Sequence, residues 1–177
     1  MKLALAMVLA LAAGTTGSAP AEWLSKPPVT GFVIGYEASN SEQSIRELVP
    51  AGETVQDWTI MITDQRLGGL VKRATPRQFA ELMAQGLGKS CPGGKVGKII
   101  DFKIDQRPAS QFYAECPINP DTGKPEAFVA LLVAGKGDLH SRQVAWRKLP
   151  TLAEINWGEE ILAGTRLCSA GSKAKGC

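Results

Sequence analysis

The sequence is poor in the residues from which catalytic and metal sites are most often built. Its 177 residues contain a single histidine, His140, and only 6% of them are aromatic. One histidine excludes a site with several histidine ligands within one copy of the chain, and the cysteines lack the paired Cys-x-x-Cys spacing of zinc sites. We therefore expect no bound metal, no cofactor and no catalytic residue of these classes.

Long apolar runs and a strong excess of one charge are also missing. The apolar run at residues 3–13 has 11 residues, whereas a helix that spans a bilayer needs about 20. The formal net charge is only +3 and is spread along the chain, so the composition gives no argument for nucleic-acid binding. We expect neither a membrane span nor a nucleic-acid partner.

The first 21 residues instead have the pattern of a secretory signal peptide. Lys2 provides the positive start, residues 3–13 the apolar centre, and Ala19-Pro20-Ala21 a small-residue cleavage site. We predict cleavage after Ala21 and a periplasmic or secreted product. Residues 22–177 then form the mature chain, whose length suits a single domain with its own core.

Four cysteines remain in the predicted mature chain: Cys91, Cys116, Cys168 and Cys177. An even number of cysteines in an exported protein is typical of disulfides, although four cysteines allow three pairings. We favour Cys91 with Cys116 and Cys168 with Cys177, because local loops close most easily. On the chain-entropy model these bridges contribute about 3.5 and about 2.7 kcal/mol.

The hydrophobic pattern predicts an α+β fold. Strands are expected at residues 31–37, 43–49, 58–66, 96–105, 110–116, 127–134 and 139–148, after an extended segment at 22–30. Short connections between consecutive strands indicate antiparallel pairing. We expect a disulfide-stapled antiparallel sheet of about six or seven strands, covered by two helices on one face.

Two capping boxes predict where these helices begin. Thr75 and Gln78 open the first helix, which we expect to end at Gly86 or Gly88. Thr151-Leu152-Ala153-Glu154 opens the second, which we expect to run to about Leu167 with a weak point at Gly158.

The glycine-rich stretch QGLGKSCPGGKVGK at residues 85–98 contains part of a phosphate-binding loop. Gly88-Lys89-Ser90 matches the end of the Walker motif, but Met83 occupies the position of its first glycine. The stretch also follows a helix, whereas the motif lies between a strand and a helix. We interpret these glycines as a helix end and a turn toward Cys91.

The strand at 139–148 carries our candidate ligand-binding residues. His140 lies next to Asp138 and Ser141, but a catalytic triad needs groups that converge from separate positions. Alternation places His140, Arg142 and Trp146 on one face of the strand. An exposed groove with Trp146 and Arg142 would bind a ligand, although tryptophans in patterned elements more often belong to the core.

The segments RELVPAGETVQDWTIMIT, TPRQFAELM and CPGG resemble a pattern in small exported bacterial proteins of uncharacterised function. Their layout is also similar to the Mog1/PsbP-like α+β fold over residues 31–90. This resemblance implies a non-enzymatic binding or assembly module, and it transfers no functional residue to this chain.

We therefore expect an exported, non-enzymatic binding or accessory module of the bacterial cell envelope, with an unknown protein or small molecule as its partner. Two alternatives stay open. A carboxylate-dependent hydrolase acting on envelope polymers would need two acidic groups in a cleft, one of them with a raised pKa. An inhibitor or immunity-type protein would present the loops at residues 91–116 and 168–177.

Overall fold

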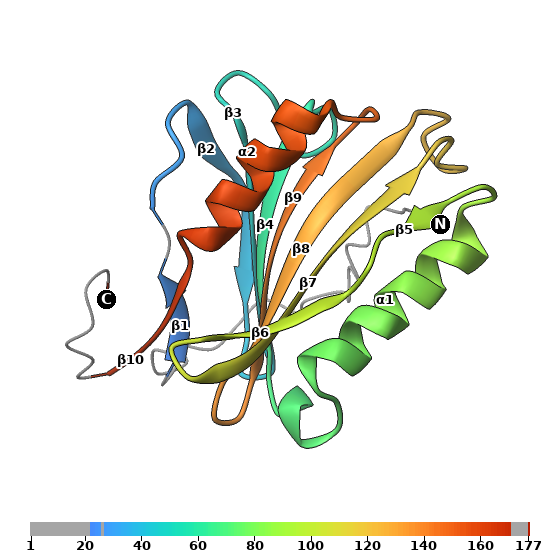
Figure 1. Ribbon diagram of the computed structural model, residues 1–177. Helices are drawn as coiled ribbons and strands as arrows, with labels where there is room; N and C mark the ends of the chain where they lie inside the picture. Colours follow the sequence, from blue (N-terminus) through green and yellow to red (C-terminus); the bar gives the residue numbers. More distant parts are fainter. Residues whose placement is uncertain (1–21, 26, 171–176) are drawn as a thin grey trace.

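A computed structural model describes residues 22–25, 27–170 and 177 of the chain (Figure 1). The predicted signal peptide, residues 1–21, lies outside the described residues. The elements in order are β1 (Glu22–Ser25), β2 (Phe32–Ser39), β3 (Gln43–Pro50), β4 (Ile60–Leu67), a 3₁₀ turn (Leu70–Lys72), α1 (Pro76–Ser90), β5 (Lys95–Val96), β6 (Ile100–Ile104), β7 (Arg107–Cys116), β8 (Glu126–Ala134), β9 (Leu139–Trp146), α2 (Leu152–Ala163) and β10 (Arg166–Ser169).

Eight of the described strands form one antiparallel sheet, which confirms the predicted α+β class. Its order is β2-β3-β4-β9-β8-β7-β5, and β6 also pairs with β7. The expected single strand at residues 96–105 is divided into β5 and β6, and for this reason the sheet exceeds our expected strand number. The extended segment at the start of the predicted mature chain becomes β1, which pairs only with β10.

The helices begin where the capping boxes predict, but both of their predicted ends are wrong. Both capping boxes form complete reciprocal hydrogen bonds. α1 continues through Gly86 and Gly88 to Ser90, because neither glycine adopts the left-handed conformation that ends a helix. α2 ends at Ala163 rather than Leu167, since residues 166–169 instead pair with β1.

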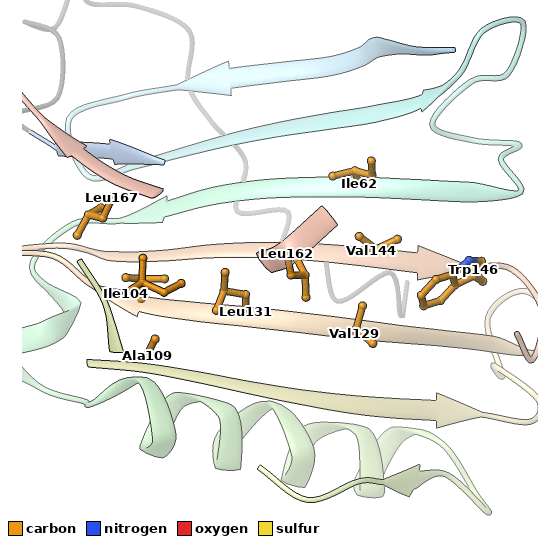
Figure 2. Packing of buried hydrophobic residues seen from close by; sticks show 10 residues of the cluster. Ile62, Ile104, Ala109, Val129, Leu131, Val144, Trp146, Leu162 and Leu167 are labelled. Carbon is orange, nitrogen blue, oxygen red and sulfur yellow. The ribbon is translucent and has the colours of Figure 1, made fainter. Parts of the chain in front are cut away.

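The two helices cover opposite faces of the sheet, so our expectation of one shared face is wrong. Along β8, Ala130 and Leu132 join the core cluster under α1, whereas Val129 and Leu131 join the cluster that contains Leu162 of α2 (Figure 2). Successive strand residues point to opposite faces. β8 is apolar at consecutive positions and buried on both sides, and such a strand needs cover on each face.

Both favoured disulfides are present. Cys91–Cys116 joins the C-terminal end of α1 to the end of β7, with 5.8 Å between the Cα atoms. Cys168–Cys177 joins β10 to the last residue of the sequence, with 5.5 Å between the Cα atoms. The described residues include no free cysteine. Two disulfides indicate an oxidising, extracytoplasmic location.

Candidate functional site

The three predicted ligand-binding residues lie together on β9, in the middle of the sheet. They share the face that α2 covers, as alternation predicts, but His140, Arg142 and Trp146 are only 2%, 1% and 0% exposed. In the described structure they therefore form no exposed groove.

Arg142 is held in a buried ion pair with Asp64, its register partner on β4. Nε of Arg142 lies 3.7 Å from Oδ1 of Asp64, and neither Nε nor Nη1 has a hydrogen-bond partner within the described residues. Burial lowers the pKa of the Arg142 guanidinium, while Asp64 acts in the opposite direction. Because arginine stays protonated in proteins, this is a charge pair within the fold.

His140 lies on the α2 side of the sheet, close to the Glu22 carboxylate of β1. Burial lowers the pKa of the His140 imidazole, against the opposing effect of Asp138 and Glu22, so the side chain is neutral at pH 7. The Glu22 carboxylate accepts hydrogen bonds from the Lys136 backbone N–H at 2.5 Å and from Nη2 of Arg107 at 3.3 Å. β1 is thereby fixed to the turn between β8 and β9.

Trp146 belongs to the core under α2, in the same cluster as Val144 and Leu162 (Figure 2). Its indole packs directly against Gly158, the glycine that the sequence marked as a weak point of α2. A Cβ atom at position 158 would lie 2.6 Å from Cη2 of Trp146. This glycine therefore permits the close approach of α2 to the sheet.

A row of polar side chains crosses the opposite face of the sheet. The strand register places Tyr36, Glu47, Thr63 and Gln143 side by side on β2, β3, β4 and β9; we call these four residues the Glu47 row. Glu47 is 8% exposed, and burial raises the pKa of its carboxyl group. Within the described residues its carboxylate makes no hydrogen bond or ion pair. A desolvated carboxylate without a partner marks a candidate functional site.

A bulge in β2 brings Tyr36 into this row. The register of β2 against β3 shifts between Ile34 and Tyr36, so that Tyr36, rather than Gly35, lies opposite Glu47. Bulges commonly redirect a side chain next to a functional site. Tyr36 is 41% exposed, so the row extends from the sheet interior to an exposed edge.

That edge is formed by β2, whose outer side pairs with no described strand. Residues 33–37 are all exposed, including Val33 at 46% and Ile34 at 54%. β2 has neither lysine nor proline, two residues that commonly prevent pairing with another chain. At the opposite edge, β6 carries Asp101 and Lys103 between its apolar residues.

Glu47 was not among our predicted site residues, although the sequence contains a signal for it. In the strand QSIRELVP, Glu47 alternates in phase with Ile45 and Val49, so an acidic residue occupies an otherwise apolar face. The sequence contains no signal that β2 lies at an edge, because the segment GFVIGYE has the composition of a central strand as well.

Other classes of site find no support in the described residues. No group of three or more histidine, cysteine, aspartate or glutamate side chains is placed to hold a metal ion there. None of the described helices is both long and apolar enough to cross a membrane.

Comparison with protein-family models and with curated proteins gives no match. Among solved structures, a Pseudomonas aeruginosa protein of unknown function, a putative regulator, aligns with a TM-score of 0.48 and 13% identity, over 71% of this chain and 80% of its own. The Ran-binding protein Mog1p of Saccharomyces cerevisiae aligns with a TM-score of 0.54 and 10% identity, over 81% of this chain and 89% of its own. Such low identity shows the fold alone. The chain therefore has the Mog1/PsbP-like fold.

Proposed function

We propose that this protein is an exported, non-enzymatic binding module of the bacterial cell envelope, which pairs the outer edge of β2 with an extended segment of a partner protein. The observation that carries the proposal is the exposed, lysine-free edge of β2 at residues 33–37. An added strand gains main-chain hydrogen bonds along such an edge, and alternate side chains supply specificity.

The two alternative functions have less support. Among the described residues, the carboxyl groups with a raised pKa are Glu47 and Glu126, on β3 and β8, which are separated in the sheet by β4 and β9. Glu126 also accepts a hydrogen bond from Nδ2 of Asn119 at 2.8 Å. The segment from Cys91 to Cys116 contains β5, β6 and β7 and is thus part of the sheet rather than a protruding inhibitor loop. Most of the second predicted inhibitor loop, residues 171–176, lies outside the described residues.

Site-specific photo-crosslinking in cells tests the proposal. The protein is exported with its own N-terminal sequence and carries a photoreactive residue at Val33, or at Phe102 on β6 as the control position. We expect one partner protein to be crosslinked from position 33, and Ile34→Lys in the same chain to remove this adduct by charging the edge. Equal crosslinking from position 102, or an adduct that survives Ile34→Lys, would exclude β2 as the binding edge.

A further inference from the structure

Within the described part of the chain the Glu47 carboxylate has no counter-ion, although a basic residue is adjacent in sequence. Arg46 points to the opposite face of the sheet, where its Nε donates a hydrogen bond to Oε1 of Glu37 at 2.8 Å. The other members of the Glu47 row are a phenol, a hydroxyl and an amide, none of which is cationic. The Glu47 row therefore contains one buried carboxyl group among neutral polar side chains, and it reaches the exposed edge of the sheet at Tyr36.

We infer that the partner strand bound at β2 presents a lysine or arginine side chain to Glu47. This inference rests on the proposed function, because the strand at β2 brings the basic group to the row. The residue opposite Tyr36 on the added strand lies on the same face as the row. It is two strand spacings from Glu47, or about 9 to 10 Å, and only a long side chain covers that distance.

The chemistry of the row favours a cation over other groups. An ammonium or guanidinium group compensates the desolvation of Glu47 and forms charge-assisted hydrogen bonds with its carboxylate. Two copies of this chain paired edge to edge would not supply the cation, because β2 contains neither lysine nor arginine. The expected partner is thus a different chain with a basic residue in an extended segment.

The test selects random linear peptides displayed on phage against the oxidised, purified protein. We expect peptides whose binding is lost in Ile34→Lys, and these peptides to share a lysine or arginine. Glu47→Gln should weaken the binding of a selected peptide at least about tenfold, as expected for a hydrogen bond to a charged group. Asp101→Asn, which removes a carboxylate from β6 at the opposite edge of the sheet, is the matched control and should leave the affinity within about twofold.

A double-mutant cycle identifies the contact. Norleucine in place of the peptide's basic residue should weaken binding to the native protein but cause no further loss with Glu47→Gln. Glu47→Gln should also melt at no lower temperature than the native protein, because it removes a desolvated charge. Peptides that depend on Ile34 but show no basic preference and no effect of Glu47→Gln would overturn this inference and leave the proposed function standing. Failure to select any peptide that depends on Ile34 would count against both.

Discussion

Gly158→Ala distinguishes helix propensity from packing in α2. In an isolated helix this change is stabilising by about 1 kcal/mol. In the folded protein the new Cβ atom would lie 2.6 Å and 2.9 Å from two carbons of the Trp146 ring, and 3.1 Å from Cγ2 of Val129. The ring is fully buried. Overpacking costs about 1–3 kcal/mol, and two contacts this short place it in the upper part of that range.

The net expectation is a loss of about 1–2 kcal/mol in the free energy of unfolding. Gly86→Ala in α1 is the matched control, because a Cβ atom at this position meets nothing within 4 Å. It should stabilise the protein by about 0.5–1 kcal/mol. Urea unfolding of the oxidised protein measures both values, and thermal melting should shift by about 2–4 °C for each kcal/mol. If Gly158→Ala proves as stable as the native protein while Gly86→Ala is stabilising, the packing of α2 against Trp146 is not as described.

Three further predictions concern stability. Reduction should lower the melting temperature by roughly 12–25 °C, because the two disulfides contribute about 3.5 and about 2.7 kcal/mol and each kcal/mol corresponds to about 2–4 °C; melting with and without excess reductant measures this. Asp64→Leu should cost about 3–5 kcal/mol in urea unfolding, because it leaves the Arg142 charge buried without its carboxylate, and adding Arg142→Leu should recover most of the loss. The hydrogen bond from Lys148, together with the Thr151 cap, lowers the pKa of Glu154 to about 2. The resulting stability is present above pH 4.5, the ordinary pKa, and is lost as the pH falls toward 2. Glu154→Gln should therefore flatten the acid limb of a pH series of thermal melts.

Each of these predictions has an outcome that contradicts it. An unchanged melting temperature in excess reductant would remove the disulfides as a source of stability. A double variant no more stable than Asp64→Leu alone would show that the loss does not come from the stranded charge of Arg142. If the acid limb has the same slope with and without Glu154, the lowered pKa of Glu154 does not contribute to stability at low pH.

The local features of the fold were predictable because local chemistry determines them. Thr75 and Thr151 start helices since a side-chain oxygen and a residue three positions later satisfy the first backbone N–H groups. The strand hairpins followed from short connections. The cysteine pairing was predictable because short loops close most easily, and each cysteine pairs with the cysteine nearest to it in sequence, as Cys91 does with Cys116.

Helix ends and exposure were less predictable, because they depend on distant partners. α1 passes through two glycines that an isolated helix would tolerate poorly, and it ends next to Cys91. α2 gives way to β10 because residues 166–169 pair with β1, which lies at the other end of the described chain. Dependence on distant partners also explains why the predicted ligand-binding residues Arg142 and Trp146 are buried, since the sequence did not show that α2 packs on their face of the sheet.

The α+β class, most of the strands and both helix starts could be read from the sequence, which also favoured the cysteine pairing that the structure has. All of these depend on alternation, capping and short-range loop closure. The tertiary structure alone decided that β4 pairs with β9, that the helices cover opposite faces, that β2 lies at an edge and that Glu47 is buried in a polar row. These features arise from contacts between segments far apart in sequence, and strand alternation carries no information about which distant strand lies next to which.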